Sequence, residues 1–501
     1  MSDSYILELK LNTKKQSDCN YLDHYFHEAW CYSNTLTRIV RKKLNLLKRD
    51  PVYISLIKEY KTASGDAKKR VGKELHAVIE SYGLTKYALQ KMLLDKRKRC
   101  RYLHSDVAQK LSDAVYCGVE KCLYKNGRDI HFNKYADFKS FENKKNTTGI
   151  IYDNGKVYIN CTPKKPKGGI ILNVILPKNK ESAHYIYETA CLCDRTKYCR
   201  IVRKQFPGGW KYYVQLVQEG SAPRKYAVGT GRVGIDIGTS SIAAASDTAC
   251  HLDTIGDNVA SVEKEIKRLN RKLDRSRRKS NPKNYNADGT IRKGRKTWTY
   301  SENYKRIRRK SASLQRKRAA SLKQAQESYA NSLLSEGNEF YIEKMNFKAL
   351  QKRKKKKDTV KGTNTNSREK SKKRFGRSIE LRAPAQLVAI LKRKAEAAGC
   401  TFVKVNTQTF KASQYNHVTD TFIKKKLSRR HNTINGIWVQ RDVYSAFLLK
   451  NSEPDYKHTN RNLCIQNYDD FKILHDECIE NIKVAYKQQN RTIPRSFGIT
   501  A

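Results

Sequence analysis

The feature that most constrains this chain is an acidic residue placed inside an apolar run. Residues 233–238 read VGIDIG, which is the pattern of a buried strand with Asp236 within it. A carboxylate in such a strand is costly unless it is paired or binds a metal. Residues 340–345, which read FYIEKM, repeat the pattern with Glu343. The sequence therefore predicts two buried strands, each with an acidic residue that needs a partner.

A third acidic residue, Asp442, opens a predicted helix whose first residues, 441–446, read RDVYSA. Ser445 and Ala446, one turn later, are small enough for this helix to pack closely against a sheet. The predicted order of strand, hairpin, helices, strand, helix, strand and helix is that of an RNase H-like fold, in which acidic residues from adjacent central strands and a late helix converge on divalent metals. Each acid alone could be a turn residue, a surface ion pair or a helix cap.

Together the three acids predict a phosphodiester-hydrolysing site. Magnesium is a hard cation that prefers oxygen ligands. Two such ions, about 3.5–4 Å apart, can activate water and stabilise the leaving oxygen of a phosphodiester. We therefore predict that Asp236, Glu343 and Asp442 are the catalytic residues and the ligands of Mg²⁺, with two ions expected.

The charge of the chain points to the substrate. Lysine and arginine total 103 against 48 acidic residues, for a formal net charge of +55, and the excess is spread along the chain. Such a chain repels itself unless a polyanion neutralises it, so nucleic acid is the expected partner. We expect no membrane partner, because no apolar run approaches the ~20 residues of a membrane span. The thirteen cysteines lack framework spacing, which favours a cytoplasmic protein whose thiols are reduced.

The candidate nucleic-acid-binding residues lie on two long basic helices and in the segment before Asp442. They are Lys267, Arg268, Arg271, Arg275, Arg308, Arg309, Lys424, Lys425, Arg429, Arg430 and Arg441. Those of the last segment could equally form a solvated face.

Three short motifs resemble a known family. Residues 234–239 (GIDIGT), 342–346 (IEKMN) and 441–446 (RDVYSA) are similar to the first, second and third RuvC motifs of the TnpB and compact type V CRISPR effector family. The third departs from the family, which usually has Arg-Asp-x-Asn-Ala. The resemblance implies an RNA-guided DNA endonuclease, which binds a guide RNA and cleaves complementary double-stranded DNA beside a short adjacent motif with one RuvC site.

The fold class expected from these patterns and the resemblance is a multidomain α+β protein. It combines an RNase H-like (RuvC) α/β nuclease domain, a small oligonucleotide-binding-type β-barrel (the wedge) and an inserted helical recognition lobe. The expected divisions are 1–15 for the first barrel strand, 16–145 for the helical lobe, 146–226 for the rest of the barrel, 227–410 for the nuclease domain with basic lid helices, 411–436 for a degenerate module, 437–455 for the last nuclease segment and 456–501 for a separate C-terminal tail.

The 411–436 module lacks the family's four-cysteine zinc ribbon. The interval 407–440 contains no cysteine, and 413–417 (SQYNH) stands where the first Cys-x-x-Cys would begin. His417 and His431 are too few ligands for a tetrahedral site, so we expect a zinc-free remnant, a short basic hairpin. A second candidate zinc cluster, formed by His184, Cys191, Cys193 and Cys199, has poor spacing in a segment that alternates like a strand, so we favour ordinary strand cysteines.

Two alternatives compete with a guided nuclease. The first is an RNA-guided DNA-binding repressor without cleavage, which the altered third motif and the missing zinc ribbon keep open. The second is a guide-independent RuvC-like structure-specific nuclease, although the chain is larger and more basic than that small fold requires.

Overall fold

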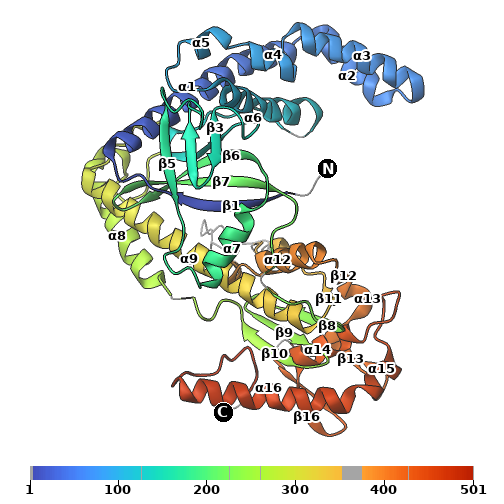
Figure 1. The fold of residues 1–501 in the computed structure, drawn as a ribbon. Helices are drawn as coiled ribbons and strands as arrows, with labels where there is room; N and C mark the ends of the chain where they lie inside the picture. The colour runs from blue at the N-terminus through green and yellow to red at the C-terminus, as the bar shows by residue number, and fades with distance from the viewer. Residues whose placement is uncertain are drawn as a thin grey trace. The chain divides into compact units, whose positions relative to one another are not determined.

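The computed structural model describes residues 4–125, 127–224, 226–259, 261–352, 375–426 and 428–499. The chain divides into two compact units, Met1–Pro223 and Arg224–Ala501, whose helices and strands are drawn in Figure 1. Each unit has its own hydrophobic core. In the part of the chain that the structure describes, no helix is both long and apolar enough to cross a membrane.

The first unit is built on a seven-stranded antiparallel sheet with the strand order β2-β6-β7-β1-β5-β4-β3. The opening strand predicted from the sequence is confirmed, and it pairs with β7 on one side and β5 on the other. The helical part is therefore inserted between two strands of one sheet. The strands are β1 (Ser4–Leu11), β2 (Ser140–Glu142), β3 (Ile150–Asp153), β4 (Lys156–Ile159), β5 (Ile170–Ile175), β6 (Thr196–Phe206) and β7 (Gly209–Glu219).

Two asparagines join the two ends of this sheet and so curl it. Asn143 donates from its side chain to the carbonyl of Ile150 on β3 (2.6 Å) and accepts from the backbone of Cys199 on β6 (2.9 Å). Asn146 accepts from the backbone of Tyr152 on β3 (2.7 Å), and its own N–H donates to Lys197 on β6. Because these side chains replace ladder hydrogen bonds, the edge strand β3 is tied to β6 beyond the short strand β2.

The helices of the first unit pack mainly through α1, whose buried face recurs at threes and fours as the sequence predicted. Figure 1 shows α2 and α3 as an antiparallel pair and α6 alongside α1. The helices α2 to α5 were not individually predicted. The helices are α1 (Gln16–Leu47), α2 (Pro51–Thr62), α3 (Gly65–Ser81), α4 (Lys86–Lys91), α5 (Leu94–Lys98), α6 (Ser105–Tyr124), the 3₁₀ turn Tyr135–Asp137 and α7 (Ala183–Leu192).

The prediction of a strand over 184–193 is wrong, because this segment forms helix α7. Ser182 caps its start by accepting the N–H of Tyr185 (3.2 Å), and His184 pairs with Glu188 one turn later (2.9 Å). Cys191 is buried on this helix. Among the residues that the structure describes, no three His, Cys, Asp or Glu side chains lie close enough to hold a metal ion. The candidate zinc cluster around Cys191 is therefore not assembled.

The second unit contains a five-stranded sheet with the order β10-β9-β8-β11-β12. The first three strands form an antiparallel meander, and β11 and β12 run parallel to β8. The edge strand β10 was missed because its sequence, CHLDT, has little apolar content. The strands are β8 (Arg232–Ile237), β9 (Ser241–Ala245), β10 (Cys250–Thr254), β11 (Glu339–Glu343) and β12 (Thr401–Val405).

Helices cover both faces of this sheet. One face packs against α9 and α12, and the other packs against α14 and α16. The two long basic helices predicted from the sequence are confirmed as α8 and α9, which lie against each other. The helices are α8 (Glu263–Ser280), the 3₁₀ turn Pro282–Asn284, α9 (Glu302–Glu336), α10 (Phe347–Leu350), α11 (Gly376–Arg382), α12 (Pro384–Ala397), α13 (Thr407–Phe410), the 3₁₀ turn Ala412–Gln414, α14 (Arg441–Lys450), α15 (Arg461–Gln466) and α16 (Tyr468–Gln488).

The C-terminal region, expected to be a separate tail, is part of the core of the second unit. Phe471 of α16 stacks on Phe447 of α14 with ring centroids 4.2 Å apart, and Phe497 is buried in the same cluster. The expected boundary at residue 436 also divides a hairpin, because β15 pairs with β16. The two small sheets of this region are β13 (Tyr415–Asn416) with β14 (Thr421–Phe422), and β15 (His431–Ile434) with β16 (Ile437–Gln440).

Candidate active site

Sheet register makes Asp236 and Glu343 neighbours. Ile235 of β8 pairs in parallel with Ile342 of β11, and the two acids are the next residues on their strands. Both isoleucines are buried in the core formed with α9 and α12. Since side chains alternate along a strand, both acids face the opposite side of the sheet, which α14 covers.

Gly234 allows α14 to lie directly on this part of the sheet. A Cβ at Gly234 would be 1.9 Å from the carbonyl oxygen of Ala446 and 2.4 Å from the nitrogen of Lys450, so no larger residue fits. The small residues of α14 were expected to permit close packing, and the carbonyl of Ala446 is indeed the contact point. Close packing brings the start of α14, with Asp442, to the face that carries the other two acids.

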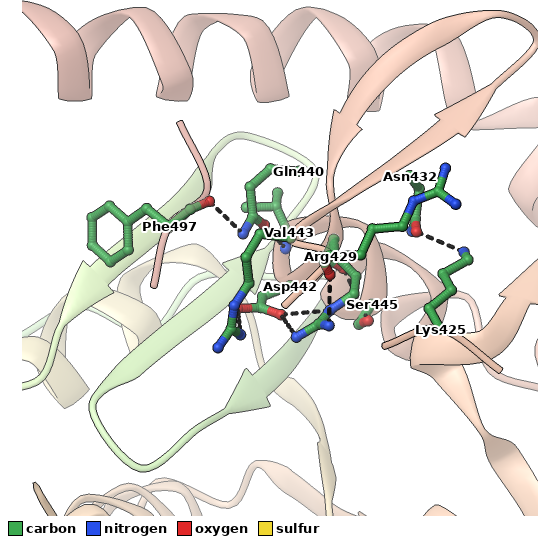
Figure 2. Close-up of polar contacts among 10 residues, drawn as sticks. Lys425, Arg429, Asn432, Gln440, Asp442, Val443, Ser445 and Phe497 are labelled. Carbon is green, nitrogen blue, oxygen red and sulfur yellow. Dashed lines mark hydrogen bonds and ion pairs between the residues drawn. The ribbon is translucent and has the colours of Figure 1, made fainter. Parts of the chain in front are cut away.

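Asp442 is held by arginines (Figure 2). Its side chain is 13% exposed, and its Oδ1 accepts from Nε (3.2 Å) and Nη2 (3.0 Å) of Arg441. Arg430 Nη1 lies 3.7 Å from Oδ2. Arg441 also donates from Nη1 to the backbone carbonyl of Arg429 (2.8 Å), which fixes its guanidinium between the two groups. The carboxylate of Asp442 is thus already paired in this structure.

The pKa values of the other two acids are both raised in the folded chain, and burial is the largest cause for each. Burial, followed by the charges of Asp442 and Glu343, raises the pKa of Asp236 well above its usual range. Arg441 and Arg430 partly offset this shift. Burial raises the pKa of Glu343 to about 7, although the backbone N–H of Ala412 donates to its carboxylate. A proton or a cation bound at this face would therefore stabilise it.

The three acidic residues are of the types that bind a hard divalent cation, but their side chains are not gathered around a position for one ion. All three acids supply oxygen donors on one side of the sheet, as magnesium requires. Asp442 is close enough to shift the pKa of Asp236. No three acidic, cysteine or histidine side chains in the described ranges, however, are gathered within reach of a single ion. Of the three carboxylates, that of Asp442 is the one paired with arginines.

The segment before β15 is joined to α14 through His417. Its Nδ1 lies 2.7 Å from the hydroxyl of Tyr444, which also accepts the backbone N–H of His417 (3.2 Å). His417 is 1% exposed, and burial lowers its pKa to about 4, so the ring is neutral at pH 7. Arg461 of α15 donates to the carbonyls of His417 (2.8 Å) and Val418 (2.9 Å). Hydrogen bonds to α14 and α15 thus hold this segment in place.

The candidate nucleic-acid-binding residues fall into two groups in the structure. Arg441 is buried against Asp442, Arg430 contacts the same carboxylate, and Lys425 donates to the side chain of Asn432 (2.6 Å). These three residues have structural partners near the acidic face. The others are exposed or half-buried on α8, α9 and the segment before β15: Lys267, Arg268, Arg271, Arg275, Arg308, Arg309, Lys424 and Arg429.

Two residues that position Asp442 were missed at the sequence level. Gln440 is fully buried and caps α14, because its Oε1 accepts the N–H of Val443 (2.7 Å). His475 of α16 is also fully buried, and its Nε2 accepts the backbone N–H of Gln440 (2.9 Å). Gln440 is a polar residue directly before the third motif, and from the sequence it could have been predicted to cap the helix that starts there. Nothing in the sequence around His475 indicated its role.

Comparisons with known proteins give structural neighbours only. No family model matches the chain, and no curated protein matches it in sequence. A chain of the cryo-EM structure of the Cas12f1-sgRNA-target DNA complex is 12% identical with a TM-score of 0.46, over 91% of this chain and 100% of that chain. A chain of the cryo-EM structure of the CRISPR-Cas12f ternary complex is 13% identical with a TM-score of 0.26, over 88% of this chain and 83% of that chain. Compact type V CRISPR effectors are thus among its structural neighbours, but at these scores the likeness assigns neither a site nor a function.

Proposed function

We propose that this chain is an RNA-guided DNA endonuclease whose RuvC-like site is formed by Asp236, Glu343 and Asp442. The observation that carries the proposal is the arrangement of the acids, two on adjacent parallel strands and the third at the start of the helix packed on the same face. The strand order of the second unit, with an antiparallel meander followed by two parallel strands, is that expected of an RNase H-like fold.

The charge of the chain supports nucleic acid as the substrate. With a net charge of +55, it can bind both a guide RNA and a target duplex through their phosphates. The exposed arginines and lysines of α8 and α9 supply backbone contacts, which carry no sequence information themselves. Base pairing with the guide RNA would supply the specificity.

Each part of the site has a distinct task in the proposed reaction. Magnesium, when bound, would supply an activated water and charge stabilisation at the leaving oxygen. Asp236 and Glu343 would provide its oxygen ligands from the rigid sheet, and Asp442 would provide another from the helix. Gly234 would hold the helix at the distance at which these three groups can meet.

The test is to purify the protein with its RNA from its native locus, sequence that RNA and incubate the complex with matching DNA and Mg²⁺. We expect one RNA species and cleavage that disappears in Asp236→Ala, while target binding remains, because binding depends on charge and pairing. Asp455→Ala, which changes an exposed acid outside the three motifs, is the matched control and should cleave normally. Cleavage retained by Asp236→Ala would refute the catalytic assignment.

A repressor without cleavage is the second candidate, and the arginine pairing of Asp442 favours it. In that case the complex would contain a discrete RNA and bind its target tightly, but neither the natural protein nor its variants would cut. Magnesium-dependent cleavage without a discrete RNA would instead indicate a guide-independent nuclease.

A further inference from the structure

The C-terminal segment 493–499 packs against the β15–β16 hairpin, which precedes Asp442 in the sequence. Phe497 is 1% exposed, and its backbone carbonyl accepts from Nε2 of Gln440 (3.1 Å), a contact visible in Figure 2. Gly498 has a φ of +66°, and a Cβ there would be 2.1 Å from the Cβ and 3.3 Å from the Cα of Arg430. The backbone of the segment therefore lies directly against Arg430, and only glycine permits this approach.

The contact of Phe497 with Gln440 and the contact of Gly498 with Arg430 each involve a residue that interacts with Asp442 or with the start of its helix. Gln440 is the N-cap of α14, so its anchoring to Phe497 fixes the first turn of the helix that carries the acid. Arg430 faces the carboxylate itself, with Nη1 at 3.7 Å from Oδ2. One short segment thus supports both the backbone and one of the two arginine partners of the third acidic residue.

We propose that segment 493–499 is a clamp that keeps Asp442 paired with arginine, and that Arg430 must withdraw before Asp442 can bind a divalent cation with Asp236 and Glu343. This inference rests on the proposed function, and it explains why the three acids share one face without forming a finished metal site. Arg430 and Gly498 are positioning residues, since neither needs to touch the substrate.

The clamp can be tested by metal binding without nucleic acid or turnover. The full-length protein is titrated with Mn²⁺, and the free ion is measured by electron paramagnetic resonance. Arg430→Gln removes the positive charge, and Gly498→Ala forces the segment away from Arg430. We expect each to tighten Mn²⁺ binding about tenfold, since a competing charge near the carboxylate is lost or displaced. Adding Asp442→Asn to either variant should remove the gain.

Arg495→Gln is the matched control, because Arg495 is an exposed arginine of the same segment, and it should bind Mn²⁺ as the natural protein does. Thermal unfolding of each variant separates a local effect from misfolding. Arg430→Gln is a change on a half-buried side chain and keeps the test valid if Gly498→Ala does not fold.

The outcomes distinguish the clamp from the proposed function. Measurable Mn²⁺ binding that depends on Asp236 but is unchanged by Arg430→Gln would overturn the clamp and leave the nuclease proposal intact. Mn²⁺ binding that is absent in all variants, or insensitive to Asp236→Ala and Asp442→Asn, would overturn the metal site and the clamp with it.

Discussion

Asp236 and Glu343 are positioned differently from Asp442. The first two acids are placed by backbone register between β8 and β11 and by the alternation of side chains on those strands. Asp442 is placed by side-chain contacts: its sequence neighbours Gln440 and Arg441 supply a cap and an ion pair, and Arg430 and the C-terminal segment add contacts from outside the helix. The sheet half of the site is therefore a frame set by backbone pairing, whereas the position of the acid in the helix half also depends on side-chain contacts.

The largest effect is expected where the helix meets the frame, at Gly234. A Gly234→Val side chain would overlap the backbone of Ala446 and Lys450, so α14 would have to move away from the sheet. We expect the second unit to lose at least about 3 kcal/mol of unfolding free energy, the upper range for overpacking, as measured by urea denaturation. Gly208→Val, at a turn glycine with open space around it, is the control. An unchanged denaturation midpoint for Gly234→Val would show that the helix does not lie this close.

The unfolding free energy should depend on pH through His417, which contacts α14 in the helix half of the site. Its pKa is about 4 in the folded chain, against 6.5 for a free histidine. The unfolded chain therefore binds a proton first as the pH falls, so the stabilisation present above pH 6.5 is lost progressively towards pH 4. The loss from this group should reach about 3 kcal/mol, measured by denaturation at a series of pH values.

The contribution of His417 is isolated by comparison with matched variants. His417→Gln should remove this part of the pH dependence, whereas His458→Gln, at an exposed histidine, should retain it. If His417→Gln follows the same pH profile as the natural protein, the ring is not buried and neutral as the structure has it.

The frame was largely predictable from the sequence, because strand and helix periods follow from which residues are buried. The apolar runs around Asp236 and Glu343 became β8 and β11, and the small residues of the third motif marked a packed helix. The spacing of apolar residues gave the wrong prediction at α7. This short segment has the alternation of a strand, but Ser182 caps a helix there. The same spacing also missed β10, whose polar residues lie at a sheet edge.

The contacts around the helix half could not be predicted, because they join residues without any shared pattern. Two departures from the resembling family, Tyr444 in the third motif and His417 where the first zinc cysteines would begin, are 27 residues apart in sequence. The structure joins them in one hydrogen bond of 2.7 Å. The buried histidine–tyrosine pair therefore joins the segment next to the site to the helix that carries Asp442.

A smaller effect of opposite sign is expected from Glu343. Its pKa is about 7 in the folded chain and 4.5 as a free group, so the folded chain holds a proton that the unfolded chain releases first. The resulting stabilisation is fully present below pH 4.5 and is lost as the pH rises through 7. We expect a loss of about 2 kcal/mol, less than full burial would give, because the side chain is partly exposed and lies near other charges.

Because the His417 and Glu343 contributions run in opposite directions between pH 4.5 and 6.5, they partly cancel in the natural protein. Glu343→Gln should therefore steepen the loss of stability at low pH and flatten it near pH 7, while Glu396→Gln, at an exposed acid on α12, should change neither. A Glu343→Gln profile parallel to that of the natural protein would mean that Glu343 is solvated and that the acidic face is not closed by α14. An altered slope would show that Glu343 is buried on the sheet face and keeps its proton until the pH rises towards 7, so a cation that binds there below pH 7 would have to displace that proton.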